Sequence, residues 1–253
     1  LYAQGYFVYD SKKAGSMTVS HLRFGPRPIH STYLVERANF VACHQFQFIE
    51  SVDVLGIAEP GATFLLNSTY GADEVWDRLP QTVQSQIIEK KLKFYVVDGY
   101  KVAKAAGMGF RINTVMQTCF FALAGILPRD EAITQIKSAI KKTYGKRGEA
   151  VLQKNYAAVD GALGEMKEVA VPASATGTVA ARSAVGAGES EFVENVIAKI
   201  FHGQGDLLPV SALPPDGTFP TDTAKIEKRS IAHDIPIWDP TICIDCAMCA
   251  LLC

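Results

Sequence analysis

The last eleven residues of the chain hold four cysteines at a fixed spacing. Cys243, Cys246, Cys249 and Cys253 form a C-x2-C-x2-C-x3-C motif, the bacterial ferredoxin spacing for [4Fe–4S] clusters. Two-residue spacers allow the first three thiolates to reach three corners of one cubane. The fourth cysteine follows a longer spacer and is expected to bind a second cluster, with closure of all four on one cluster as the alternative. A zinc site or a disulfide framework fits less well, because zinc sites favour separated pairs and disulfides are spread along secreted chains.

The other two cysteines have a different setting. Cys43 lies in the apolar stretch 38–43, which predicts a buried strand, and Cys119 lies in an apolar predicted helix. Free cysteines in such places behave as small apolar side chains. We therefore expect both to be inert core thiols.

Composition excludes several classes of protein. The 253 residues include 25 Lys and Arg against 26 Asp and Glu, and 48% are hydrophobic. This is the balance of a globular chain, without the basic excess that attracts nucleic acid. The longest apolar run, residues 118–127, is shorter than the roughly 20 residues of a membrane span. We expect neither nucleic acid nor membrane as a partner.

The hydrophobic pattern predicts an α/β fold. Apolar runs typical of strands occur at 6–9, 17–24, 40–43, 62–66 and 92–97, with helical patterns at 73–78, 82–90 and 99–106. Such alternation is typical of a Rossmann-like, mostly parallel sheet. Helices alone are predicted afterwards, at 113–127, 130–144 and 149–166.

Four parts are expected along the chain. Residues 1–167 form the α/β domain, and 168–190, rich in Ala, Gly, Ser and Thr, form a flexible linker. Residues 191–240 contain one short helix at 191–201 and an extended tail rich in Pro and Gly. Residues 241–253 carry the cysteine motif. The chain begins without Met and ends within this motif, so we expect it to be an internal piece of a longer polypeptide.

Two short motifs suggest an anion site in the α/β part. Gly107 and Gly109 allow a close approach of the backbone to a ligand, and Arg111 precedes the helix expected from Asn113. Lys12 and Lys13 end a predicted strand, where α/β folds place ligands. Taken alone, an ordinary turn is the better explanation of the two glycines. Asp98 is better explained as a helix N-cap than as a ribose contact.

Several stretches together resemble one enzyme family. They are Tyr9–Lys13 (YDSKK), Thr18–Gly25 (TVSHLRFG), Lys91–Tyr95 (KLKFY), Arg111–Asn113 (RIN), Leu208–Ser211 (LPVS), Ile226–Arg229 (IEKR) and the cysteine motif. The chain resembles pyruvate:ferredoxin/flavodoxin oxidoreductases over essentially its whole length. The order of parts resembles a gamma-type domain, a segment named for its Glu-Lys-Arg motif, and the start of a two-cluster ferredoxin domain.

The resemblance implies a function for the full polypeptide. The family converts pyruvate and CoA to acetyl-CoA and carbon dioxide, and passes electrons through [4Fe–4S] clusters to ferredoxin or flavodoxin. Thiamine diphosphate and its Mg lie in domains outside this chain, so no catalytic residue is expected here and the piece alone is not expected to be active. The remaining domains of the polypeptide, a homodimer and a cytoplasmic location are also implied.

The resemblance also assigns CoA contacts. Lys12 or Lys13, Asn113 and Asn155 match positions similar to the CoA contacts of the family, and the region Gly107–Arg111 becomes part of the same expected site. Two alternatives stay open. One is an oxidoreductase for another 2-oxoacid, and the other is a non-catalytic iron–sulfur electron-transfer module. CoA binding would separate the second alternative from the enzyme.

Overall fold

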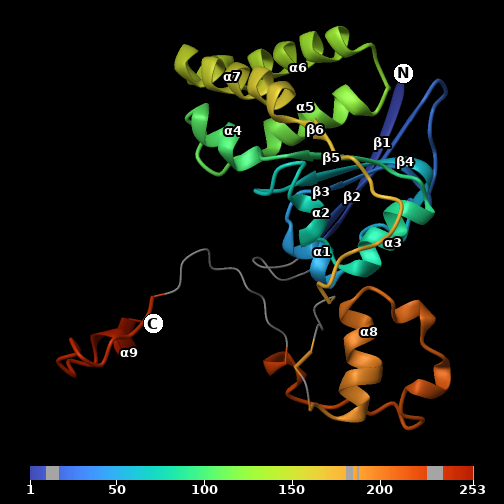
Figure 1. The fold of residues 1–253 in the computed structure, drawn as a ribbon, viewed down its shortest axis with the longest axis vertical. Helices are drawn as coiled ribbons and strands as arrows, with labels where there is room; N and C mark the ends of the chain where they lie inside the picture. The colour runs from blue at the N-terminus through green and yellow to red at the C-terminus, as the bar shows by residue number, and fades with distance from the viewer. Residues whose placement is uncertain (10–16, 181–184, 187, 227–235, 253) are drawn as a thin grey trace.

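The computed structural model of the protein describes residues 1–9, 17–180, 185–186, 188–226 and 236–252 (Figure 1). Several residues singled out from the sequence lie outside this part of the chain. They are Lys12, Lys13, Cys253 and the Glu227–Arg229 motif.

Strands and helices alternate between residues 38 and 105, and helices follow one another from there to residue 165. The strands are β1 (Tyr2–Tyr9), β2 (Thr18–Gly25), β3 (Ala38–Cys43), β4 (Ala58–Asn67), β5 (Lys93–Val97) and β6 (Lys167–Glu168). The helices are α1 (Gln47–Ser51), α2 (Val75–Arg78), α3 (Gln81–Glu89), α4 (Gly99–Ala105), α5 (Asn113–Leu123), α6 (Arg129–Tyr144), α7 (Glu149–Glu165), α8 (Ala198–Phe201) and α9 (Met248–Leu252).

The central sheet has the strand order β3-β4-β5-β6. The pairs β3–β4 and β4–β5 are parallel, and the short β6 pairs antiparallel to β5. Helical crossovers join the parallel strands, as this geometry requires. The sequence prediction of an α/β fold with a mostly parallel sheet is therefore confirmed.

The first two strands stand apart from this sheet. β1 and β2 form an antiparallel two-stranded sheet of their own, with Tyr2 opposite Gly25 and Tyr9 opposite Thr18. The hydrophobic pattern alone counts both runs among the strands of the α/β unit, and the structure corrects this. The connection from Tyr9 to Thr18 is too short for the crossover of a dozen or more residues that a parallel pair needs.

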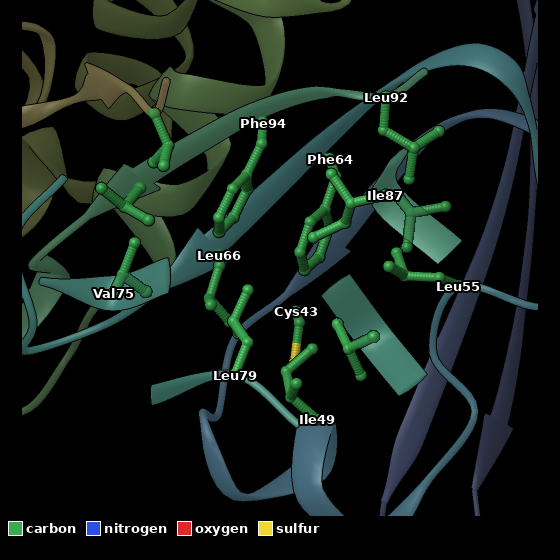
Figure 2. Close-up of a cluster of buried hydrophobic side chains, with 14 of the residues drawn as sticks. Cys43, Ile49, Leu55, Phe64, Leu66, Val75, Leu79, Ile87, Leu92 and Phe94 are labelled. Atoms are coloured by element: carbon green, nitrogen blue, oxygen red, sulfur yellow. The ribbon is translucent and has the colours of Figure 1, made fainter. Parts of the chain in front are cut away.

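Side chains alternate between the two faces of the central sheet. Phe64 and Leu66 of β4 point toward α1, α2 and α3, and Phe94 of β5 stacks on Phe64 with ring centroids 5.0 Å apart (Figure 2). Leu65 of β4 points to the opposite face, where it packs with residues of α4, α5 and α7. The period of two along a strand produces this three-layer arrangement, and Figure 1 shows the two helical layers on either side of the sheet.

The segment after β6 lies against the α/β unit rather than leaving it at once. Val169 is buried in the hydrophobic cluster that includes residues of α3, and Val171 packs against the same cluster. Gln84 of α3 accepts hydrogen bonds from the backbone N–H groups of Thr176 (2.8 Å) and Gly177 (2.7 Å). The residues of the expected flexible linker, 168–190, that precede residue 178 thus contact the α/β unit, and a flexible linker over 168–190 stays a prediction.

The helix at 191–201 has a small core of its own. A π-helical turn, Val193–Ile197, continues into α8, and Val193 and Ile197 pack against Val185 and Ile226. The Nδ1 of His202 donates a hydrogen bond to the Ser51 carbonyl of α1 (2.5 Å), which joins this small unit to the α/β part. No helix among the described residues is long and apolar enough to cross a membrane.

Candidate functional site

A cavity of about 260 Å³ opens at the carboxyl ends of β4 and β5. Its walls come from residues 68–72, 96–98, Lys101, Glu165 and Lys167. Open α/β sheets bind ligands at this edge. Lys101 and Glu165 form an ion pair of 2.7 Å across the cavity wall, and the hydrogen bond with Glu165 raises the pKa of Lys101.

Asp98 lies in the wall of this cavity and caps α4. Its side chain accepts a hydrogen bond from the backbone N–H of Lys101 at 2.9 Å. The N-cap role expected from the sequence is therefore confirmed.

Gly107 ends α4 in a left-handed conformation, with φ of +69°. The Gly107 N–H donates to the Lys104 carbonyl (3.0 Å), and the Met108 N–H donates to the Ala103 carbonyl (2.8 Å). These two bonds form the Schellman motif, in which a glycine closes a helix. Helix termination therefore accounts for Gly107, and both amides already have acceptors in the chain.

The chain between Gly107 and α5 presents a polar, exposed turn. Gly109 also has positive φ, +64°, and a side chain at this position would meet no atom within 4 Å. Arg111 and Asn113 are exposed, with Asn113 at the first turn of the 11-residue helix α5. Such a helix start offers N–H donors and the positive end of the dipole to an anion.

A lysine that the sequence analysis did not select lies beside this turn. Lys154 of α7 approaches Gly107, where an added Cβ would stand 3.3 Å from the lysine Cε and 3.7 Å from its Nζ. Only the packing of α7 against α4 and α5 brings this cation near the turn. No local motif in the sequence signals it.

Asn155 has a different setting from the residues just described. It is buried, with 5% of its surface exposed. Its Oδ1 accepts a hydrogen bond from the Thr114 hydroxyl of α5 (3.1 Å), and its Nδ2 donates to the Val151 carbonyl (2.8 Å). Asn155 thus links α7 to α5 at Thr114, the residue that follows Asn113. A contact between Asn155 and CoA stays a prediction.

The described cysteines of the terminal motif are all exposed. Asp245 and Ala247, which lie between these cysteines, have positive φ values of 52° and 57°. The Cys243 sulfur accepts a hydrogen bond from the Asp245 N–H at 3.4 Å.

The donor set of this motif suits an iron–sulfur cluster. Three exposed thiols at two-residue spacing, with a backbone N–H directed at one sulfur, match the ligands and hydrogen bonds that such clusters use. Within the described residues, however, the sulfurs are not gathered into a group of three or more metal ligands.

The remaining cysteines are confirmed as core thiols. Cys43 and Cys119 are both buried, and burial raises the pKa of each to about 12. The thiolate is the reactive form of cysteine, so a buried thiol whose pKa is raised is inert at neutral pH.

Comparison with known families gives two matches. Residues 1–165 match the model described as pyruvate ferredoxin/flavodoxin oxidoreductase. Residues 178–232 match a model described as a domain of unknown function, which carries the letters EKR as its label. The second match spans the small helical unit and the Glu227–Arg229 motif.

Relatives match the chain from end to end. A putative pyruvate-flavodoxin oxidoreductase of Synechocystis sp. is 55% identical over all 253 residues, and the pyruvate-flavodoxin oxidoreductase of Rhodospirillum rubrum is 54% identical. The pyruvate:ferredoxin oxidoreductase of Moorella thermoacetica is 49% identical. In each case all of this chain is covered, but only 21–22% of the relative. The chain therefore spans about a fifth of these relatives' length.

A solved structure shares the fold. Subunit PORC of the pyruvate oxidoreductase from Thermotoga maritima matches with a TM-score of 0.50 at 19% identity. The match covers 66% of this chain and 80% of that subunit. At this identity the similarity supports the α/β fold.

Proposed function

Because the chain belongs to the pyruvate ferredoxin/flavodoxin oxidoreductase family, we propose that it is part of an enzyme that oxidises pyruvate. The full polypeptide would convert pyruvate and CoA into acetyl-CoA, carbon dioxide, a proton and two electrons. The observation that carries this proposal is the identity of 54–55% along the whole chain to pyruvate-flavodoxin oxidoreductases. Thiamine diphosphate and Mg would be held by domains outside these 253 residues.

In this proposal, the terminal cysteine motif binds the clusters that transfer electrons. Cys243, Cys246 and Cys249 would hold one [4Fe–4S] cluster, and Cys253 would serve a second. Clusters of this type accept and release single electrons, which suits delivery to ferredoxin or flavodoxin. The backbone N–H of Asp245, 3.4 Å from the Cys243 sulfur, would stabilise negative charge on that thiolate.

In this proposal, the α/β part binds CoA. The exposed turn from Gly109 to Asn113 and the start of α5 would bind phosphate oxygens, with Arg111 as a bidentate donor. Lys154 beside Gly107 adds a second cation near this turn. Lys12 and Lys13 are proposed as further contacts on the resemblance alone. The cavity at the carboxyl ends of β4 and β5, lined by Lys101, is the competing location.

Two variants separate these locations. Arg111→Gln in the full-length enzyme should raise the KM for CoA about tenfold, with kcat little changed, because one charge-assisted interaction with phosphate is lost. Lys101→Gln is the matched test of the cavity. An increase in KM with Lys101→Gln and none with Arg111→Gln would move the CoA site to the cavity.

The activity itself is tested on the full-length polypeptide, purified without oxygen. We expect reduction of ferredoxin or flavodoxin that requires both pyruvate and CoA. Preference for 2-oxoglutarate or a branched-chain oxoacid would instead support the other 2-oxoacid enzymes. Electron transfer without any requirement for CoA or an oxoacid would support a non-catalytic iron–sulfur module. We also propose that the full-length enzyme forms a homodimer and is located in the cytoplasm.

A further inference from the structure

The two-stranded sheet of β1 and β2 has two chemically different faces. Because side chains alternate along a strand, the register assigns each residue to one face. The inner face carries the polar Gln4, Tyr6, His21 and Arg23, with Tyr2, Val8, Val19 and Gly25 toward its ends. The outer face consists of Ala3, Gly5, Phe7 and Tyr9 of β1, with Thr18, Ser20, Leu22 and Phe24 of β2.

The chain that follows covers the middle of the inner face, whereas Tyr2 (50% exposed) and Val8 (43% exposed) near its two ends stay open. Arg23 donates hydrogen bonds to the carbonyls of Tyr33 (2.7 Å) and Leu34 (2.9 Å). The Val35 N–H donates to His21 Nδ1 (3.1 Å). The polar residues of this face therefore hold the segment 31–35 in place, and neither solvent nor a ligand is needed to explain them.

The outer face is uncharged, mostly apolar and largely open. Phe7 is 62% exposed, Tyr9 74% and Leu22 45%, although all three belong to regular strands. At the base of the face, Phe24 packs against Phe120 and Phe121 of α5, with ring centroids 6.0 and 6.3 Å apart. The α/β unit thus covers one end of the outer face, and the apolar side chains farther along it stay exposed.

Such a surface is unfavourable in water. An isolated two-stranded sheet is marginal unless its apolar face packs on something, and contiguous exposed apolar patches mark interaction sites. No residue of the outer face carries a charge, so the face also lacks the usual protection against wrong association.

We propose that the outer face of β1 and β2 is the docking surface for another part of the same, longer polypeptide. In the relatives, 78–79% of the polypeptide lies outside the region that this chain matches, since the match covers 21–22% of each. A tethered domain binds at high effective concentration, so a modest apolar surface suffices. The occupant should present an apolar, uncharged surface that continues the packing begun by Phe24.

The composition of the face favours a permanent occupant over a visiting one. Interfaces with electron carriers are small and transient, and charge complementarity guides their association. Permanent interfaces resemble the interior of a domain and are depleted of charge at their centre. The outer face, with Phe7 and Leu22 in its middle and Tyr9 at its far end, belongs to the second type.

Cysteine labelling in the full-length polypeptide tests this proposal. Ser20→Cys places a thiol on the outer face opposite Phe7, and Ser138→Cys places one on the exposed side of α6 as the matched control. Each rate of maleimide labelling is read by peptide mass spectrometry and divided by the rate in urea. We expect the thiol at position 20 to be protected about tenfold or more relative to the thiol at position 138. Equal labelling would overturn the proposal, and Thr18→Cys repeats the test should Ser20→Cys fold poorly.

Crosslinking identifies the occupant. A photoreactive p-benzoylphenylalanine at position 7 is introduced into a mixture of isotopically heavy and light full-length chains. Crosslinks within chains of one isotope, to regions outside these 253 residues, support the proposal. Heavy–light crosslinks would show a second copy and overturn it. The proposal rests on membership of the family and not on the proposed activity, so a parallel assay of pyruvate oxidation keeps the two failures distinguishable.

Discussion

The side-chain oxygen of Asn67 accepts a hydrogen bond from the backbone N–H of Gly99 at 2.8 Å, and both residues are buried. The Asn67 amide also donates to the His44 carbonyl at 2.9 Å. One side chain thereby joins the end of β4, the chain after β3 and the start of α4. These are the elements that form the carboxyl edge of the sheet, next to the cavity.

Removing this side chain should destabilise the α/β unit. We expect Asn67→Ala to lower the free energy of unfolding by about 2 kcal/mol, because a buried donor and an acceptor lose their partner. Asn39→Ala, on the exposed side of β3, is the matched control and should stay within about 0.5 kcal/mol of the parent protein. Denaturant unfolding measures the free energy of unfolding of both variants. An equal loss in the two would contradict a specific stabilising role of Asn67.

Gly177 should tolerate no side chain. A Cβ at this position would stand 2.8 Å from Gln84 Nε2 and 2.9 Å from the Leu79 carbonyl, so Gly177→Ala must push the segment 174–179 away from α3. We expect new protease cleavage after residue 168 and a loss of about 1–3 kcal/mol. In Gly164→Ala the added Cβ meets nothing within 4 Å, and the change should instead stabilise helix α7 by about 0.5–1 kcal/mol. An unchanged cleavage pattern in Gly177→Ala would contradict the anchoring.

These two cases show what the sequence could and could not predict. Apolar runs such as 62–66 and 92–97 predicted the strands β4 and β5, because burial on both faces selects such runs. The bond between Gln84 and residues 176–177 joins positions about ninety apart, and no local pattern predicts it. The same holds for Lys154 beside Gly107.

The ligands of the cysteine motif, in contrast, can be predicted from a local sequence pattern. Its spacing alone predicts the ligands, because the cluster fixes which thiolates must converge. The CoA region lies between these extremes. Gly107 was selected for flexibility and proved to be a helix-ending glycine, whereas the exposed Arg111 and Asn113 remain available for a ligand.

The two asparagines near α5 should respond differently to mutation. Asn113 is exposed, so Asn113→Ala should leave the free energy of unfolding unchanged. It should raise the KM for CoA about threefold or more. Asn155 is buried and bonded to Thr114, so Asn155→Ala should lower the free energy of unfolding by about 1–3 kcal/mol. Steady-state kinetics and denaturant unfolding are compared for both variants. A raised KM without loss of stability in Asn155→Ala would instead make Asn155 a direct CoA contact.

Alkaline pH should destabilise the fold through its buried thiols. Burial raises the pKa of Cys43 and Cys119 from 9.0 to about 12, so the folded protein keeps these protons where the unfolded chain releases them. Below pH 9 each protonated thiol makes its full contribution to the free energy of unfolding. This contribution falls by about 1.4 kcal/mol per pH unit as the pH rises toward 12. Unfolding of the parent protein and of Cys119→Ala is compared across this range. The stability difference between them should change with pH, and parallel curves would contradict burial of the thiol.

The terminal cysteines should divide between two clusters. Cys243, Cys246 and Cys249 share two-residue spacers and can meet one cubane, whereas Cys253 follows three residues that include Leu251 and Leu252 of α9. By ferredoxin logic, Cys253 binds the cluster whose other ligands come from a second motif. In the full-length polypeptide, Cys246→Ser and Cys253→Ser should therefore each lose one cluster, but different ones. Iron analysis and EPR of the two anaerobically purified variants check this.

Cys43→Ser is the matched control, because Cys43 is a buried thiol that is not expected to bind a cluster. The iron content of this variant should equal that of the parent protein. Identical EPR spectra for Cys246→Ser and Cys253→Ser, with the same remaining signal, would show that all four cysteines close on a single cluster.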